Sequence, residues 1–91
     1  MSVIVYHFWS PTCVPCQNIK PSIEALREDF EDKDIKWVSV NTHNDPQGYA
    51  AQWKVSIVPT MVVTKGGQEI GRHSGTTMSI YYTLIRRALA A

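Results

Sequence analysis

The apolar residues of this chain follow two different periods, and each period predicts a type of secondary structure. Residues 3–9 form an unbroken run of β-branched and aromatic residues around one polar member, which is typical of a strand covered on both faces. From Cys13 to Phe30 the apolar positions instead recur every three or four residues, which predicts a helix with a single apolar face. Pro21 lies within this helix, and we expect it to kink the axis because it removes one backbone donor.

A second strand and a second helix are predicted in the middle of the chain. Residues 35–41 are rich in β-branched and aromatic residues and follow a charged turn, which favours a strand. The pair Asp45-Pro46 predicts a helix start, with the aspartate as N-cap and the proline at the first helical position. The inward face of this short helix would carry Pro46, Tyr49, Ala50 and Trp53.

The last third of the chain predicts a hairpin and a final helix. Residues 60–65 and 68–73 are expected to pair as antiparallel strands around Gly66-Gly67, and Thr76 or Thr77 can cap the helix that follows. The apolar spacing of this last helix predicts one buried face, made of Tyr81, Leu84, Ile85 and Ala88. The resulting order is β-α-β-α-β-β-α. With right-handed crossovers for the first two βαβ connections, this order gives an α/β fold with a four-stranded mixed sheet flanked by helices. We assign residues 1–91 to a single domain.

Composition and charge narrow the class of partner. Apolar residues make up 44% of the chain and charged residues 19%, as in ordinary globular proteins, which excludes disorder. The net charge of +1 gives no reason to expect nucleic acid or an anionic membrane as partner. No apolar run approaches the ~18 residues of a membrane span, and no basic segment opens a signal peptide. We therefore expect a cytoplasmic protein in a reducing environment.

The only two cysteines, Cys13 and Cys16, lie where the first strand passes into the first helix. A helix N-terminus favours a thiolate at Cys13 through its backbone N–H groups and its macrodipole. Cys16 follows about one turn later, close enough to form a disulfide with Cys13. In a reducing compartment such a pair is more often redox-active than structural, so we predict a dithiol–disulfide exchange site.

Two other uses of the cysteine pair stay open at this point. Zinc requires four ligands, and the histidines that could join the pair are scattered and accompanied by no second CxxC: His7, His43 and His73. The pair could also be redox-silent. Covalent haem attachment is excluded because Gln17 follows Cys16 where a histidine would be required. We expect no metal, and no cofactor beyond a Cys13–Cys16 disulfide.

Around these cysteines the chain resembles the thioredoxin family, and the likeness covers nearly all of its length. The segment from Phe8 to Cys16 is similar to the active-site segment of the family. Three further segments resemble its cis-proline loop, its β-hairpin and its substrate-side glycine, in that order: Val58-Pro59-Thr60, Lys65-Gly66-Gly67-Gln68-Glu69 and Ser74-Gly75. A CxxC alone is a weak signal. A CxPC after an apolar strand, with a Val-Pro-Thr ~45 residues later, is far more specific.

The resemblance implies a thioredoxin-like fold and a thiol–disulfide oxidoreductase that reduces protein disulfides. It makes Cys13 the nucleophile that forms a mixed disulfide with the target, and Cys16 the resolving cysteine. An extended substrate would lie against a cis Val58–Pro59 bond by strand addition. The other residues expected around the site are Thr12, Val14, Pro15 and Gly75 at the substrate surface and Trp9 beside the active-site loop. The implied partners are protein disulfides and a flavoenzyme of the thioredoxin-reductase type, with the protein acting as a monomer.

The chain departs from the family pattern at several positions. Full-length thioredoxins carry an extra strand and helix ahead of the first strand found here. Thr12 replaces the usual tryptophan, and Val14 replaces the usual glycine. The family's buried aspartate beneath the second cysteine corresponds to His7, and its lysine neighbour corresponds to Ser39. A neutral His7 could accept the proton of Cys16, a charged His7 would raise the reduction potential, and a histidine that only fills the core would do neither.

Two other functions compete with the reductase. A glutaredoxin-like oxidoreductase that depends on glutathione would fit the short chain, although glutaredoxins usually carry a tyrosine within the CxxC. A redox-silent interaction module would keep the thioredoxin fold for a partner and use its cysteines only incidentally. We expect the reductase, and therefore a reducing potential for the cysteine pair.

Overall fold

The computed structural model describes residues 2–91, and its elements follow the predicted order. They are β1 (Val3–Trp9), α1 (Val14–Asp29), β2 (Ile35–Asn41), α2 (Tyr49–Gln52), β3 (Thr60–Lys65), β4 (Gln68–Ser74) and α3 (Met78–Ala90). This order confirms the β-α-β-α-β-β-α prediction, with β4 one residue longer than expected. Within residues 2–91 no helix combines the length and the apolar character needed to cross a membrane.

The strands form one mixed sheet in the order β2-β1-β3-β4. β1 runs parallel to β2 and antiparallel to β3, and β3 pairs with β4 as an antiparallel hairpin. The expectation of a parallel crossover at both early connections was therefore wrong for the second one. The chain leaves β2, passes over the sheet through the short helix α2 and returns as β3 in the opposite direction.

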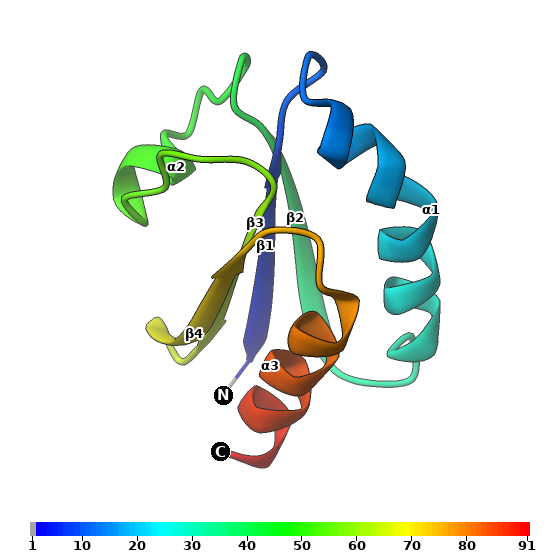
Figure 1. The fold of residues 1–91 in the computed structure, drawn as a ribbon. Coiled ribbons are helices and arrows are strands. Elements are labelled where there is room, and N and C mark those ends of the chain that lie inside the picture. The colour runs from blue at the N-terminus through cyan, green and yellow to red at the C-terminus, as the bar shows by residue number, and fades with distance from the viewer. Residues whose placement is uncertain (1) are drawn as a thin grey trace.

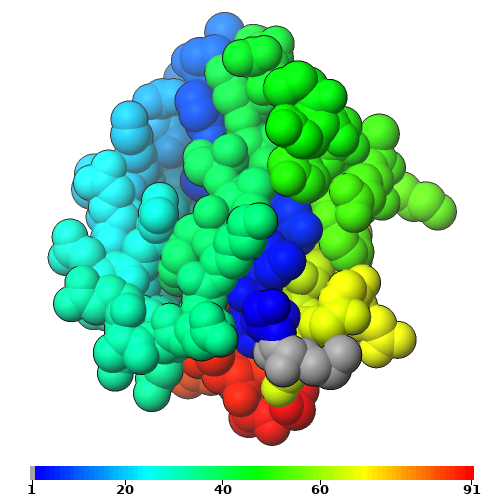
Figure 2. Space-filling model, turned by 180° about the vertical axis from the view of Figure 1, so that it is seen from behind, coloured from blue at the N-terminus to red at the C-terminus, as the bar shows by residue number. Residues whose placement is uncertain are grey.

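Helices cover both faces of the sheet, which explains the unbroken apolar run of β1. In Figure 1, α1 and α3 lie on one side of the sheet and α2 lies on the other. The larger core lies between the sheet and the first pair of helices, and its fully buried members include Val5, Leu26, Met61 and Ile85. The smaller core, beneath α2, contains Tyr6, Phe8, Val40 and Val62. Figure 2 shows the molecule from behind, where residues of the blue N-terminal strand remain visible between the teal segment that includes β2 and the green segment that includes α2.

The start of α2 differs from its prediction. The helix begins at Tyr49, with Gly48 as its N-cap residue in the left-handed region at φ +70°. Asp45 caps the helix from further back, because its two carboxylate oxygens accept the N–H groups of Tyr49 and Ala50 at 3.0 and 2.9 Å. Pro46 therefore lies in the preceding turn and is exposed, whereas the inward face of α2 was expected to include it.

The ends of the two long helices follow local rules. α1 continues through Pro21 as a single helix and ends at Asp29, with Arg27 in its last turn near the negative end of the helix. α3 begins after Thr77, one of the two predicted capping residues, although the Thr77 side chain makes no capping hydrogen bond. The inward face of α3 is as the periodicity predicted, with Tyr81, Leu84, Ile85 and Ala88 all buried.

Candidate active site

Cys13 and Cys16 form a disulfide at the N-terminus of α1, with 5.2 Å between their Cα atoms. Cys13 is the N-cap residue in an extended backbone conformation, and its Sγ accepts the N–H of Cys16 at 3.2 Å. Pro15 follows in the first turn, where a missing N–H costs nothing because no carbonyl is available to it. Cys13 is half-buried, whereas Cys16 is only 4% exposed. The outer sulfur is therefore the one that a second molecule can reach.

The sheet register brings the Pro59 and Gly75 segments to the same end as the disulfide. Phe8 lies opposite Thr60, and Thr60 lies opposite Ser74. Residues that follow β1, precede β3 and follow β4 therefore all leave the sheet at one end. The Val58–Pro59 peptide bond is cis, and Pro59 is buried. Its carbonyl accepts the N–H of Gly75 at 2.9 Å, which ties the two segments together.

Two large apolar side chains are exposed at this end of the molecule. Val14, between the cysteines, is 67% exposed, and Ile57, two residues before Pro59, is 60% exposed. Thr12 and Pro15 are exposed as well. The resemblance to the family indicated Thr12, Val14 and Pro15 at this surface but not Ile57, although its place next to the Val-Pro-Thr motif could have indicated it. Both large apolar side chains are therefore available for contact with another molecule.

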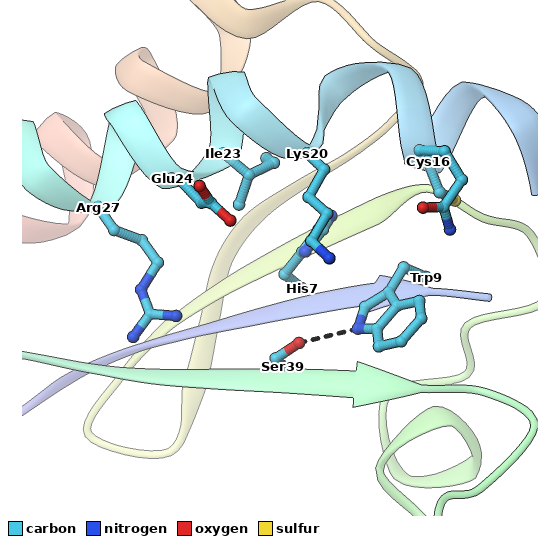
Figure 3. A pocket seen from close by; sticks show the side chains of 9 residues that line it. His7, Trp9, Cys16, Lys20, Ile23, Glu24, Arg27 and Ser39 are labelled. Carbon is cyan, nitrogen blue, oxygen red and sulfur yellow. Dashed lines mark hydrogen bonds between the residues drawn. The ribbon is translucent and has the colours of Figure 1, made fainter. Parts of the chain in front are cut away.

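A cavity of about 270 Å³ lies behind Cys16, between α1 and the strands β1 and β2. Figure 3 shows the α1 side chains that reach down toward the strands at its rim, which include Lys20, Glu24 and Arg27. The strands contribute His7, Trp9 and Ser39. The indole Nε1 of Trp9 donates a hydrogen bond to Ser39 Oγ at 2.8 Å, which fixes the tryptophan ring beside the cavity (Figure 3).

His7 and Cys16 line this cavity together, so the structure brings the histidine to the inner cysteine. His7 lies in β1 between Ser39 of β2 and Met61 of β3. Its Nε2 is buried and has no hydrogen-bond partner among residues 2–91. Burial lowers the pKa of His7 from 6.5 to about 4, because the charged ring would lose its water. The ring is therefore neutral at pH 7 in the disulfide form.

The other histidines lie away from this cluster. His43 is exposed in the loop after β2, and His73 lies in β4, where its ring packs edge-on against Tyr81. In the described part of the chain, no group of three or more His, Cys, Asp or Glu side chains is arranged to hold a metal ion. The structure thus joins Cys13, Cys16 and His7 into one site and leaves the remaining histidines outside it.

Comparison with known proteins identifies the family. The thioredoxin family model matches residues 1–85. The chain belongs to the thioredoxin family. Thioredoxin 1 of Nostoc sp. is 37% identical over 67 residues, which cover 74% of this chain and 61% of that protein. Haemophilus influenzae thioredoxin is 36% identical over 72 residues, which cover 79% of this chain and 65% of that protein. The matches thus span less than two thirds of the length of these relatives.

Solved thioredoxin structures share the fold. The chain superposes on Fasciola hepatica thioredoxin with a TM-score of 0.80 and 31% identity, covering 94% of this chain and 81% of that one. Trypanosoma brucei brucei thioredoxin gives a TM-score of 0.85 at 20% identity, with 98% of this chain and 76% of that one covered. These likenesses confirm the predicted thioredoxin-like fold and the resemblance on which it was based.

The cavity lies where this thioredoxin-family chain departs from the family pattern. The resemblance implies an aspartate at position 7 and a lysine at position 39, and this chain carries His7 and Ser39 instead. The two residues are paired across β1 and β2 and both line the cavity. Serine is much shorter than lysine, so the side chain at position 39 takes up less of the wall of the cavity than a lysine could. The sequence indicated both residues, but only the structure locates the space between them and α1.

Proposed function

We propose that this protein is a thiol–disulfide oxidoreductase that reduces protein disulfides through Cys13 and Cys16. The observation that carries the proposal is the geometry of the pair: a half-exposed Cys13 at a helix N-cap, with a buried Cys16 bonded to it from within the same helix. A helix N-terminus stabilises the thiolate that attacks, and the buried partner stays in reach for the second step. Membership of the thioredoxin family supports the same chemistry.

The reaction proceeds in two exchange steps. In the reduced protein, the Cys13 thiolate attacks one sulfur of a target disulfide, which forms a mixed disulfide and releases the other target sulfur as a thiolate. Cys16 then loses its proton and attacks the Sγ of Cys13. The second target sulfur leaves, and the Cys13–Cys16 disulfide forms. Two electrons pass from the protein to the target, and the disulfide is the only redox group that the protein needs.

His7 is the proposed proton acceptor for Cys16. The neutral imidazole lines the same cavity as Cys16, and its unpartnered Nε2 is free of any competing hydrogen bond within residues 2–91. A thiolate that forms beside the ring supplies a negative charge, and this charge raises the pKa of His7 during the step in which it takes the proton. The proton would then leave the ring through the cavity, whose rim carries the polar side chains of Lys20, Glu24 and Arg27.

The substrate is proposed to dock as an extended segment beside Val58 and Gly75. Main-chain hydrogen bonds to the Val58 backbone would hold the segment without demanding a particular sequence, while Gly75 lines the same surface. The exposed apolar side chains of Val14 and Ile57 would contact apolar groups next to the target disulfide, while Thr12 and Pro15 line the approach to Cys13. Trp9 would hold the shape of the active-site loop through its bond to Ser39.

The physiological partners follow from the same chemistry. We propose a flavoenzyme of the thioredoxin-reductase type as the electron donor, protein disulfides as the acceptors, a monomeric protein, and a reducing compartment such as the cytoplasm. A lone vicinal cysteine pair is suited to such a compartment because it cycles between dithiol and disulfide.

Reduction of insulin disulfides tests the proposal. Wild type, Cys13→Ser and Cys16→Ser are compared with dithiothreitol, with thioredoxin reductase and NADPH, and with glutathione as electron donors. We expect wild type to work with the first two donors, Cys13→Ser to be inactive, and Cys16→Ser to accumulate a mixed disulfide at Cys13. Activity with glutathione in place of the flavoenzyme would indicate the glutaredoxin-like alternative. Wild-type protein that reduces no disulfide with any donor would contradict the proposal and leave the interaction module.

A further inference from the structure

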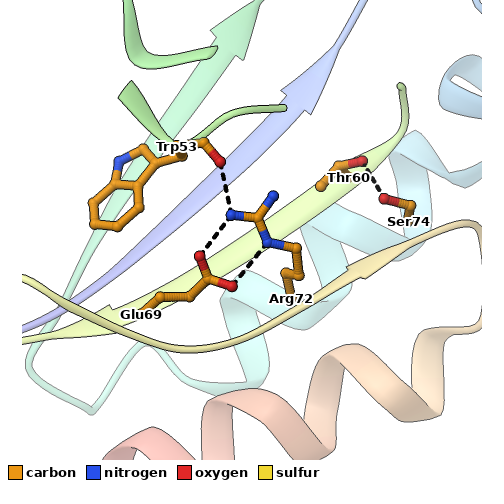
Figure 4. Close-up of polar contacts among 5 residues, drawn as sticks. All are labelled: Trp53, Thr60, Glu69, Arg72 and Ser74. Atoms are coloured by element: carbon orange, nitrogen blue, oxygen red, sulfur yellow. Dashed lines mark hydrogen bonds and ion pairs between the residues drawn. The ribbon is translucent and has the colours of Figure 1, made fainter. Parts of the chain in front are cut away.

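Two loops at the substrate side are joined by side-chain and backbone hydrogen bonds. We call residues 56–59 the proline loop and residues 75–77 the glycine loop. Thr60 is 1% exposed, and its hydroxyl donates to the carbonyl of Ile57 in the proline loop at 2.7 Å. Since a threonine has only one hydroxyl proton, the 2.7 Å contact between Ser74 and Thr60 places Ser74 as the donor (Figure 4). The strand that leads into the glycine loop is thereby tied to the proline loop.

Tyr81 holds the glycine loop from the side of α3. Its hydroxyl donates to the carbonyl of Gly75, while the Gly75 N–H donates to Pro59. Both backbone groups of Gly75 are therefore bonded within the protein. The Tyr81 ring is fully buried, and the His73 ring packs against it with 5.6 Å between centroids. A Cβ at position 75 would lie 3.2 Å from His73 Nε2, and the φ of +137° also favours glycine, so the loop has little room to move toward β4.

We propose that Tyr81 and Ser74 are positioning residues for substrate docking, which fix the glycine loop and the proline loop as one rigid wall beside the disulfide. The inference rests on the proposed function, because it concerns the surface that would receive the target. Apolar periodicity alone explains why Tyr81 is buried, but a leucine or phenylalanine would fill that space equally well. The Tyr81 hydroxyl group makes one hydrogen bond, to the carbonyl of Gly75, and the N–H of this glycine is bonded to Pro59.

We expect a rigid wall to affect the binding of the substrate more than the exchange reaction at Cys13. When an extended segment adds to a preformed backbone edge, it does not also have to order the protein, and the association is correspondingly tighter. Loss of either hydroxyl frees the glycine loop in the unbound protein, and binding then includes the cost of ordering it. The reaction at Cys13 depends on the N-terminus of α1, which neither Tyr81 nor Ser74 contacts through a hydrogen bond. The effect is therefore expected in KM rather than in kcat.

Tyr81→Phe and Ser74→Ala test the inference, with Tyr82→Phe as the matched control. Tyr82 is the next residue of α3, and its hydroxyl donates to Asp29 of α1 instead. We expect the KM for insulin to rise about fivefold in Tyr81→Phe with kcat unchanged, since one hydrogen bond contributes about 1 kcal/mol. Reduction of the small disulfide bis(2-hydroxyethyl) disulfide has no extended segment to dock and stays at the wild-type rate. Tyr82→Phe keeps both activities, and Ser74→Thr, which retains a hydroxyl, keeps the wild-type KM.

Hydrogen exchange of the Gly75 amide provides a readout that does not depend on activity. In the substrate-free disulfide form, this N–H is bonded to Pro59, and we expect it to exchange faster in Tyr81→Phe and Ser74→Ala but not in Tyr82→Phe. Unchanged exchange, a KM equal to that of wild type, or equal losses with insulin and the small disulfide would each overturn the inference. A wild-type protein without any disulfide reductase activity would instead overturn the proposed function, while the exchange result would still report on the wall.

Discussion

The backbone N–H of Cys16 donates a hydrogen bond to the Sγ of Cys13 at a distance of 3.2 Å. Cys13 thus occupies the position that serine, threonine or aspartate usually takes at the start of a helix. The same N–H and the positive end of the helix dipole face this sulfur after reduction, when it carries a negative charge. A single donor therefore links the stability of α1 to the reactivity of the sulfur at its end.

Two substitutions of Cys13 separate the capping role from the disulfide. Both Cys13→Ser and Cys13→Ala remove the disulfide, but only serine can accept the N–H of Cys16. We expect Cys13→Ser to exceed Cys13→Ala by about 1 kcal/mol in its free energy of unfolding, measured with urea. The same two substitutions at Cys16 are the control, and the opposite order is expected there. Cys16 is 4% exposed, so Cys16→Ser should be less stable than Cys16→Ala because a buried serine hydroxyl costs free energy. Equal stability of the two Cys13 variants would show that the sulfur does not cap the helix.

Because His7 is buried in its neutral form, the free energy of unfolding of the disulfide form depends on pH. The folded pKa of about 4 lies below the unfolded value of 6.5, so between these values the unfolded chain binds more protons. The contribution of neutral His7 to the free energy of unfolding is fully present above pH 6.5 and is lost as the pH decreases toward 4. At 1.36 kcal/mol for each pKa unit, the loss is about 3 kcal/mol.

Urea unfolding between pH 4 and pH 7 measures this loss, and the His7→Asn variant removes it. His43→Asn is the matched control, since it makes the same substitution at a histidine that is exposed in the loop after β2 and lies outside the cavity. The comparison subtracts the titration of all other groups, which the variants share. A His7→Asn protein with the same pH dependence as wild type would mean that the histidine is protonated at no cost in the fold.

The strands and the long helices could be predicted from sequence because their apolar residues follow a clear period and the same residues are buried in the two cores. The unbroken run of β1 is covered on both faces, and the apolar face of α1 lies on the larger core. The start of α2 was misplaced because Asp45 caps the helix across an intervening turn. Gly48, which ends this turn, permits the left-handed conformation but does not by itself require it, so the sequence left the start of the helix open. The direction of β3 likewise depends on which strand it pairs with, which a short linking helix does not determine.

The site was predicted only as far as local motifs reach. Cys13, Cys16 and Pro59 belong to short segments with specific spacing, and the register of three strands brings their segments to one end. The charge state of His7 depends on its burial among β2, β3 and α1, which only the folded chain brings together around β1. Tyr81 was assigned to the core correctly, but periodicity gives the face of a helix and not the partner of a hydroxyl group.

Gly71 marks a close contact between β4 and α3 that can be tested through stability. A Cβ built at this position would lie 2.6 Å from the Cδ2 atom of Leu84, which is 6% exposed. We expect Gly71→Ala to lower the free energy of unfolding by about 1–3 kcal/mol through overpacking. Leu84→Val shortens the opposing side chain, so the double variant should be more stable than the sum of the two single losses predicts. Strictly additive losses would place the strain elsewhere.

Arg72 joins the β3–β4 hairpin to the end of α2. Its guanidinium binds both carboxylate oxygens of Glu69, at 2.8 and 2.6 Å, and donates to the carbonyl of Trp53 at 2.7 Å (Figure 4). A lysine keeps the charge but has no planar fork to serve both partners at once. We expect Arg72→Lys to lose about 0.5–1 kcal/mol of unfolding free energy, while Arg87→Lys on the exposed face of α3 loses almost none.

Glu69→Gln separates the stability that the Arg72–Glu69 ion pair contributes from the stability contributed by the hydrogen bond between Arg72 and the carbonyl of Trp53. The hydrogen bond from Arg72 lowers the pKa of Glu69, so the ion pair contributes above the ordinary carboxyl pKa of 4.5 and is lost as the pH falls through the lower folded value. Glu69→Gln should therefore differ from wild type at pH 7 and converge with it in acid, and 0.5 M salt should reduce the difference. The carbonyl bond to Trp53 depends on neither variable, so the further loss in Arg72→Lys should persist in acid and in salt. If both variants became equal to wild type under those conditions, the Trp53 contact would contribute nothing to stability, and the link between the hairpin and α2 would be purely electrostatic.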